Sequence, residues 1–573
     1  MSKVIYICFK KASRANADMA GKIEAIAHRI TPNNISPHPP KVVVGNNIVY
    51  GIVNPVSSIK ENGKSVLLGM SFGEDTHWWE PETEIPDGSY SIFRSNDRKT
   101  EILTDVTGSR SVWYYHDDEI FVASSSQRAI VMVLGDFRFN DDVIPWMIST
   151  GSVGPYLSWD TRIKLLEPDS SLILDHSAWS LTSNSNKILF KSVDIPDTEQ
   201  EDRLRAGLLS TFKSLKIDFA KWVLPLSGGY DSRGILSMFN LIGLSLTNVR
   251  AVTWGTKEAS QQKGNDAFVA KELAEHYKVK HTYYTTNNSD EPLEELLTRF
   301  LICGEGRIDH ISGYMDGFNI WKTLFENQID GIIRGDVTFS SKASDSVSDI
   351  RKIHGFPLCN DFANLKETQE FGFSHQTLPA SFEQQPNESL DVTRDRLYHQ
   401  FRLPIVLAAL NDLKLPYVEV INPLMSKQLV HLTREMGDHL RSNKALFKKV
   451  VNTISPNIEY ATNGANANAK LFLKSRAAVN LFSNELKLES SKAIFNANFI
   501  DYILNNLTIT EGYVHKKPTL KMFILKYLPK GLRKTAKSLN TGRTVDVNVL
   551  AFRSYIISKM KVLLLEDARL FNK

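Results

Sequence analysis

The sequence has few cysteines, no long apolar run and no marked excess of either charge. Cys8, Cys303 and Cys359 are its only cysteines, too few for a disulfide scaffold and not at metal-ligand spacing, which favours a reducing compartment. No stretch approaches the roughly 18 apolar residues of a membrane-spanning helix. Lysine and arginine number 68 against 64 aspartates and glutamates, a balance that gives no reason to expect nucleic-acid binding. We therefore expect a cytoplasmic protein with no membrane or nucleic-acid partner.

The 573 residues divide into two parts with different patterns. Up to about residue 190, short β-type runs are separated by turn residues, which predicts a sheet-rich domain over 1–196. The second predicted domain spans 197–573. Strands and helices alternate in it from Trp222, which predicts a parallel sheet with crossover helices, and the last 170 or so residues have a mostly helical pattern. Residues from about 338 to 396 are polar, and we interpret them as an insertion or a flexible lid.

A glycine loop lies between a predicted strand at 223–226 and a predicted helix at 232–241. It reads Ser-Gly-Gly-Tyr-Asp-Ser over residues 227–232. Glycines allow the backbone to approach a ligand, and the loop amides and helix N-terminus face an anion such as pyrophosphate. Ser227 and Ser232 can donate to phosphate oxygens, and Asp231 can hold Mg²⁺. The alternative is a plain strand-to-helix turn, but this sequence is more specific than a bare Gly-Gly turn and predicts nucleotide binding.

The loop resembles the pyrophosphatase loop of the asparagine synthetase-like ATP-dependent amide ligases, the group of asparagine synthetase B, β-lactam synthetase and lasso-peptide cyclase. Residues 252–255 are similar to the strand of that family that holds the adenine, and Gly335-Asp336 to the element with the second Mg²⁺ carboxylate. The resemblance implies that ATP and Mg²⁺ bind here, with Asp231 and Asp336 as metal ligands. The nucleotide-binding residues that it implies are Leu226, Ser227, Gly228, Gly229, Asp231, Ser232, Val252, Trp254 and Gly335.

The N-terminal half resembles the glutaminase-type domain of the same family, through residues 45–50, 87–92 and 104–110. The expected fold class is therefore α/β, with an N-terminal-nucleophile (Ntn) hydrolase-like sandwich domain followed by an adenine-nucleotide α-hydrolase-like (PP-loop) domain. Glutamine-using members expose a cysteine at position 2, where this chain has Ser2. We expect an inactive glutaminase domain, so that the amine comes from another substrate or from the same one.

Two positions of the synthetase part depart from the family pattern. Three residues before Asp336, where relatives place an acidic or hydroxyl side chain, the chain has Ile333, which has no acid–base capacity. Relatives also carry a lysine about eight residues after a proline. In this chain the proline is Pro456, and the corresponding position is Asn463 or Gly464. Either another residue serves in the amine-transfer step, or that step is weak or lost.

Two further groups of charged residues are candidates. The segment 303–310 is a polar cluster near the acyl-accepting pocket of the family, and we assign Glu305 together with Arg334 to the catalytic set beside Asp231 and Asp336. A solvated helix cap is the alternative for that segment. A second group is a basic run on a predicted helix, either a solvated face or a docking surface, at Lys526, Lys530, Arg533, Lys534 and Lys537.

The sequence thus predicts an ATP-dependent carbon–nitrogen ligase that forms AMP through an acyl-adenylate. The substrate class that we favour is a precursor peptide closed into a macrolactam, as by a lasso-peptide cyclase, with a processing protease as a partner. Small-molecule ring closure, asparagine-type synthesis and a non-catalytic ATP-binding protein are the alternatives.

Overall fold

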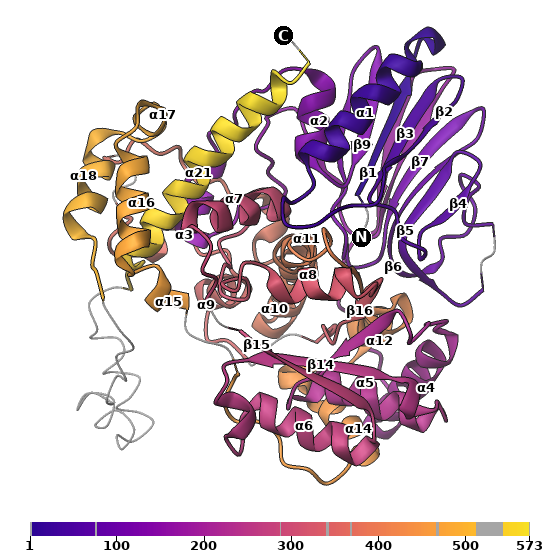
Figure 1. Ribbon diagram of the computed structural model, residues 1–573. Helices are drawn as coiled ribbons and strands as arrows, with labels where there is room; N and C mark the ends of the chain where they lie inside the picture. Colours follow the sequence, from indigo (N-terminus) through magenta and orange to yellow (C-terminus); the bar gives the residue numbers. More distant parts are fainter. Residues whose placement is uncertain are drawn as a thin grey trace.

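The structure is a computed structural model that describes residues 3–74, 77–286, 288–339, 343–366, 370–465, 469–510 and 543–571. It is a mixed α/β protein with three sheets (Figure 1). Two of them stack at one side of the molecule, the third lies below, and helices fill the rest. Among the helices of the described residues, none has both the length and the apolar surface that crossing a membrane requires.

The N-terminal part contains two six-stranded antiparallel sheets. The strands of the first, in spatial order, are β10 (Lys164–Leu165), β8 (Trp113–His116), β9 (Ile120–Ser124), β1 (Lys3–Phe9), β3 (Ile48–Val53) and β2 (Lys41–Val44). Those of the second are β12 (Ser180–Ser185), β11 (Ser170–Asp175), β7 (Lys99–Thr104), β6 (Asp87–Ser95), β5 (Ser65–Phe72) and β4 (Lys60–Asn62).

Strand β1 shows why the sheets stack as they do. Its alternate residues Val4, Tyr6 and Cys8 belong to the core between the two sheets. Ile5 and Ile7 point to the other face and pack with the helices that cover the first sheet. These outer helices include α1 (Ala17–Arg29) and α2 (Gln127–Leu134). The N-terminal part also contains the short helices η1 (Ala12–Arg14) and α3 (Val143–Thr150).

The third sheet has five parallel strands. In spatial order they are β15 (Lys280–Thr285), β14 (Arg250–Gly255), β13 (Trp222–Pro225), β16 (Gly331–Ile333) and β17 (Glu419–Ile421). The chain order runs outward from β13 in both directions, so the loops after β13 and β16 diverge. In open parallel sheets the crevice at such a reversal, at the carboxyl ends of the strands, is where ligands bind.

Several helices surround the parallel sheet in the lower part of Figure 1. Those labelled there are α4 (Asp197–Ser214), α5 (Tyr230–Leu241), α6 (Asp266–Tyr277), α12 (Lys427–Glu435) and α14 (Ala445–Ile454). The chain between and beside them also forms α13 (Asp438–Arg441), η2 (Leu246–Asn248), η3 (Ala259–Gln261), η7 (Pro423–Met425) and η8 (Ser442–Lys444).

The part predicted as a polar insertion contains short helices and a buried aromatic cluster. Phe356 and Phe382 are fully buried and stand against Phe401, with ring centroids 4.4 and 5.8 Å from it. The helices of this region and the chain leading to it are α7 (Leu293–Gly304), α8 (Asn319–Glu326), α9 (Val347–His354), η4 (Cys359–Asp361), η5 (Ala380–Phe382), α10 (Leu390–Leu397), η6 (Tyr398–Leu407) and α11 (Ala408–Asp412).

The C-terminal end is helical, as predicted, and returns to the first half of the chain. It contains α15 (Ala469–Phe472), α16 (Arg476–Leu486), α17 (Glu489–Lys492), α18 (Ala497–Asn506) and α21 (Val547–Ala568). In α21, Asp567 forms a fully buried ion pair with Arg128 of α2, 2.7 Å long. One apolar core includes residues of both halves, so the two predicted domains share it. The predicted basic helix at 526–537 lies outside the described residues.

Candidate functional site

The glycine loop lies at the strand reversal of the parallel sheet. It follows β13 and ends at Gly229, the N-cap of α5. The backbone N–H and the hydroxyl of Ser227 both lie 3.0 Å from the Ser232 hydroxyl, which fastens the loop to the helix. The Gly228 N–H donates to the Asp266 carboxylate at 3.2 Å. The loop is thus held from both sides, with its serine hydroxyls at the mouth of the crevice.

Gly228 has no room for a side chain. A Cβ atom there would lie 2.5 Å from the Cβ of Ala461 and 2.8 Å from that of Val269. The N–H of Ala461 donates to the Gly228 carbonyl at 3.1 Å. The loop after Pro456 therefore packs directly on the glycine loop, and only glycine permits this approach.

A cavity of about 300 Å³ opens beside the loop. Most of the predicted nucleotide-binding residues line it. Val252 does not, but its carbonyl accepts the N–H of Leu226 at 2.8 Å and sets the position of the loop. Gly228 and Gly229 form the loop without lining the cavity. The lining residues are Pro225, Leu226, Ser227, Asp231, Ser232, Thr253, Trp254, Asp266, Arg334, Gly335, Asp336 and Ala465.

Asp231 reaches this cavity from the first turn of α5, which follows β13, and Asp336 reaches it from the loop after the neighbouring strand β16. Asp231 forms a 2.6 Å ion pair with Lys444, yet its Oδ1 is buried without a hydrogen bond to any described residue. Burial raises the pKa of Asp231, Lys444 opposes this, and the charge of Asp336 adds to the increase. The unpartnered oxygen and the repulsion between the two carboxylates are features of a site that a cation would complete.

Asp336 has a different partner. The Arg334 guanidinium contacts it through Nη2 at 3.2 Å and Nε at 3.3 Å. Burial alone would raise the pKa of Asp336, but the attraction of Arg334 outweighs it and holds the pKa below its usual value. Among the described residues no group of three or more His, Cys, Asp or Glu side chains could hold a metal. Two carboxylates fit Mg²⁺, which takes most of its ligands from water and substrate phosphates.

The loop after Pro456 is fixed by aromatic and cationic contacts. Tyr460 stacks on Tyr230 with ring centroids 3.8 Å apart, and the Arg233 guanidinium lies 3.8 Å from the Tyr460 centroid. Arg233 also donates to the carbonyls of Ile458 and Glu459 at 2.6 and 3.0 Å. These contacts hold the loop against the start of α5.

The structure gives the surroundings of the residues that depart from the family pattern, Ile333 and Asn463 or Gly464. Asn463 is exposed, and its carbonyl accepts the N–H of Asp266 at 2.9 Å. The Gly464 carbonyl accepts from the Asn265 side chain at 3.1 Å. Neither position supplies a cation. Ile333 is fully buried in the core beside the sheet.

Sequence reasoning did not single out two lysines near the pocket. Lys444 is the residue that pairs with Asp231. Lys414 is buried, donates to the Leu410 carbonyl and lies 5.9 Å from the ring centroid of Trp321. Burial and the nearby Arg334 lower its pKa to about 7, although Asp336 opposes this. Neither lysine belongs to a motif, so only the folded arrangement reveals them.

The structure does not bring Glu305 to this cavity. Glu305 is 3% exposed and accepts from Lys3 at 2.8 Å, from the Ser126 hydroxyl and from the Gln127 N–H at 2.9 Å. Burial raises its pKa, but the Lys3 charge and the hydrogen bonds outweigh this, and the net pKa is lowered. These hydrogen bonds connect Glu305, at the end of α7, to the first strand. Glu305 therefore does not line the cavity with Asp231, Asp336 and Arg334, the other residues of the predicted catalytic set.

Neighbours of Glu305 in the 303–310 cluster form similar ion pairs. Arg307 pairs with Asp412, and Asp309 pairs with Arg553 of α21 at 2.7 Å. The segment is neither a solvated helix cap nor a lining of the cavity.

No protein-family model matches the chain, and no curated protein sequence matches it. Two solved structures are reported among those that match. Glutamine phosphoribosylpyrophosphate amidotransferase from B. subtilis, complexed with ADP and GMP, is 10% identical over 49% of this chain and 65% of its own, with a TM-score of 0.19. The structure titled the allosteric regulatory enzyme of purine biosynthesis is 11% identical over 50% and 81%, with a TM-score of 0.20.

The chain therefore spans less than two thirds of the first of these enzymes. Both TM-scores are too low to support a functional argument, and the function proposed below depends on the geometry of the site alone.

Proposed function

We propose that the protein is an ATP-dependent amide ligase of the asparagine synthetase-like type, with the PP-loop site at the reversal of the parallel sheet. The observation that supports this most is the meeting of Asp231, Asp336 and the serine hydroxyls of 227 and 232 in one cavity. Ser227 and Asp336 lie in the loops after β13 and β16, and Asp231 and Ser232 lie in the first turn of α5. This end of a parallel sheet is the place where such a sheet binds its ligand. The Oδ1 of Asp231, which has no hydrogen bond to any described residue, is suited to be a ligand of a cation.

In the proposed reaction a substrate carboxylate oxygen attacks the α-phosphorus of ATP. The bond from that phosphorus to the pyrophosphate oxygen breaks, which gives an acyl-adenylate and pyrophosphate. An amine then attacks the acyl carbon, the bond to AMP breaks, and the nitrogen releases a proton. Mg²⁺, held by Asp231 and Asp336, would neutralise phosphate charge.

Lys444 is our proposed replacement for the missing family lysine. It pairs with Asp231, which lines the cavity, and its side chain is 27% exposed, so it can turn towards a phosphate. Arg334 in the same cavity is a second donor for phosphate or carboxylate. These two side chains supply the positive charge that Asn463 and Gly464 do not.

The substrate that we favour is a precursor peptide closed into a macrolactam, with a partner protease, and the alternatives are small-molecule ring closure and asparagine-type synthesis. Ser2 lies outside the described residues, and the absence of glutaminase activity stays a prediction. Cys8 is no substitute nucleophile, because it is fully buried and burial raises its pKa to about 12. A non-catalytic ATP-binding role is the second candidate, favoured by the buried Ile333.

The deciding experiment measures products from labelled ATP and Mg²⁺ with a peptide and metabolite extract of the source cell. AMP and pyrophosphate should form with the wild type and be lost in Asp231→Asn, because that change removes the charge without altering the size of the side chain. Asp197→Asn is the matched control, since Asp197 is exposed and pairs with His439 at the surface. ATP binding without AMP formation would favour the non-catalytic role, and turnover by Asp231→Asn would contradict the assignment.

A further inference from the structure

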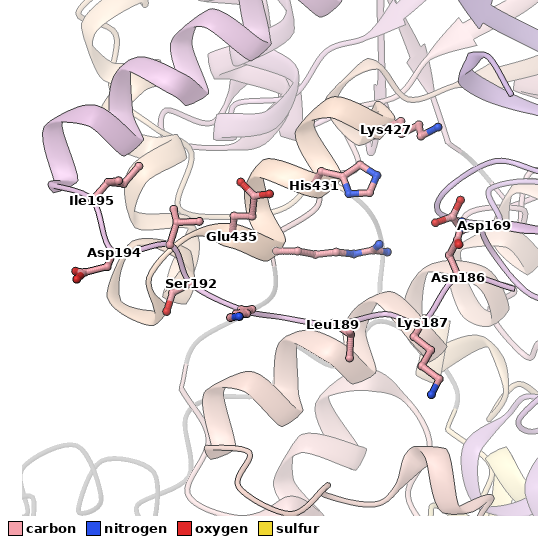
Figure 2. Close-up of a pocket in the computed structure, with 13 residues that line it drawn as sticks. Asp169, Asn186, Lys187, Leu189, Ser192, Asp194, Ile195, Lys427, His431 and Glu435 are labelled. Atoms are coloured by element: carbon pink, nitrogen blue, oxygen red, sulfur yellow. The ribbon is translucent and has the colours of Figure 1, made fainter. Parts of the chain in front are cut away.

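A second, larger cavity of about 980 Å³ lies apart from the glycine loop. It forms where the chain leaving the second sheet passes the helix α12, and it shares no lining residue with the first cavity. Figure 2 shows Lys427, His431 and Glu435 along α12, Asp169 across from His431, and Lys187 and Leu189 on the passing segment. Nothing in the proposed ligase chemistry uses this place.

Backbone hydrogen bonds fix the walls of this cavity. The N–H groups of Lys191 and Val193 donate to the carbonyls of Arg434 and Glu435 at 3.0 and 2.9 Å. The Asn186 N–H donates to the Asp169 carbonyl at 3.2 Å. The cavity is therefore built from main-chain contacts between the passing segment and the end of α12, and its side chains are presented from a rigid frame.

Arg434 is the most unusual of the lining side chains. It is 6% exposed, and its Nε and Nη2 are buried with no hydrogen bond to any residue in the described part of the chain. Burial lowers its pKa to about 10, and only Asp169 acts against that effect. A buried guanidinium without acceptors is costly, because the charge has lost water and has gained no partner.

The charge around Arg434 is also unbalanced. None of the ammonium groups of Lys187, Lys191 and Lys427, which line the same cavity, forms an ion pair within the described ranges. Three carboxylates oppose these four cations, and one of them, Glu435, is already paired with Arg203 at 2.5 Å. The cavity is left with an excess of two positive charges.

We propose that this cavity binds the phosphate group of a small molecule, with the Arg434 guanidinium as its anchor and the lysines as its rim. A phosphate monoester is a dianion near neutral pH, which matches the excess of two charges, and its oxygens are the acceptors that a guanidinium fork prefers. A single carboxylate would leave half of the excess charge uncompensated. The volume exceeds what free phosphate needs and leaves room for an organic group beside Leu189.

The test is calorimetric titration of the full chain with inorganic phosphate and with phenyl phosphate, in low salt and without Mg²⁺. We expect one site, with phenyl phosphate binding more tightly because of its apolar group. Arg434→Gln should weaken binding about tenfold or more, as expected for losing a charge-assisted contact. Lys191→Gln and Lys427→Gln, at the accessible rim, should each weaken it about threefold and weaken it less in high salt.

Two controls separate this site from the glycine loop. Lys449→Gln, on the surface of α14 where Lys449 pairs with Glu201, should leave the affinity unchanged. Gly228→Ala should also leave it unchanged, because that change alters only the first cavity. The proposal is overturned if the wild type binds neither probe at about 10 mM, a concentration well above any specific phosphate affinity. It is equally overturned if Gly228→Ala abolishes binding, or if both rim variants bind like the wild type. Equal affinity for the two probes would contradict an organic ligand.

Discussion

Glu305 and Asp231, two carboxylates of the C-terminal half, both pair with a lysine, and yet their surroundings differ: Glu305 is buried, whereas the Asp231 side chain is 30% exposed and only its Oδ1 is buried. Both oxygens of Glu305 accept hydrogen bonds, and its pKa is lowered. One oxygen of Asp231 has no partner in the described part of the chain, and its pKa is raised. A fully satisfied carboxylate has completed its bonding in the folded protein, whereas a half-satisfied one beside a cavity keeps an oxygen for a ligand.

The same substitution in the two pairs should therefore have unequal costs. Lys3→Met leaves Glu305 charged, buried and unpaired, and should reduce the free energy of unfolding by about 3–5 kcal/mol. The side chains of Lys3 and Glu305 are only 6% and 4% exposed, so water cannot replace the lost partner. Urea unfolding at pH 7 measures the difference, and Lys3→Arg should retain most of the stability.

The pH dependence of that difference checks its cause. Glu305 has a lowered pKa in the folded state, so the pair contributes stability above the ordinary glutamate pKa and loses it as the pH falls through the folded value. The difference in the free energy of unfolding between the wild type and Lys3→Met should therefore become smaller at acidic pH. A gap that stays constant down to the lowest pH at which the protein folds would assign the loss to packing instead of charge.

Gly228→Ala tests the site of Asp231, because Gly228 belongs to the glycine loop that precedes this residue. The added methyl would meet Ala461 and Val269 at distances that no real Cβ tolerates, so the loop has to shift. Overpacking of this kind costs about 1–3 kcal/mol, which we expect as a loss of ATP affinity of about tenfold or more. Equilibrium binding of labelled ATP measures it.

Gly21→Ala in α1 is the matched control for that loop change. Nothing lies within 4 Å of the added atom, and alanine favours the helix, so ATP affinity should stay as in the wild type. Equal ATP affinity of Gly228→Ala and the wild type would exclude the glycine loop from nucleotide binding.

The local structure around the site was predictable because its periodicity is strong. The strand predicted at 223–226 is confirmed one residue earlier, at Trp222–Pro225. Helix α5 begins at Tyr230, two residues before its predicted start, since the glycine turn is tighter than the pattern shows. The reversal of strand order then brings the two aspartates to one cavity.

The features that sequence reasoning did not reveal depend on contacts between distant parts of the chain. Glu305 was placed near the acyl pocket by resemblance, but its partner Lys3 lies 302 positions away. No sequence pattern links Lys444 to Asp231, or reveals that Nε and Nη2 of Arg434 are buried without an acceptor among the described residues. Charge pairing of this kind is set by tertiary packing, whereas motifs report only local geometry.

Lys444→Met gives the smallest stability effect and the sharpest test of the comparison. The side chains of Lys444 and Asp231 are 27% and 30% exposed, so solvent screens the pair and its loss should change the free energy of unfolding by no more than about 1 kcal/mol. Removing the lysine takes away a charge that lowers the pKa of Asp231, and that pKa should rise further. The acidic limb of AMP formation should then move to higher pH, because Asp231 must be ionised to act.

A pH–rate profile of AMP formation measures this shift, with Lys449→Met in α14, the helix that follows Lys444, as the unchanged control. If Lys444 also contacts phosphate, the rate at the optimum should fall together with the shift of the limb. A shift without a fall would limit Lys444 to positioning Asp231. An unmoved limb would mean that the ion pair of the free protein has no part in the reaction, and the half-satisfied carboxylate would then be a structural feature like Glu305.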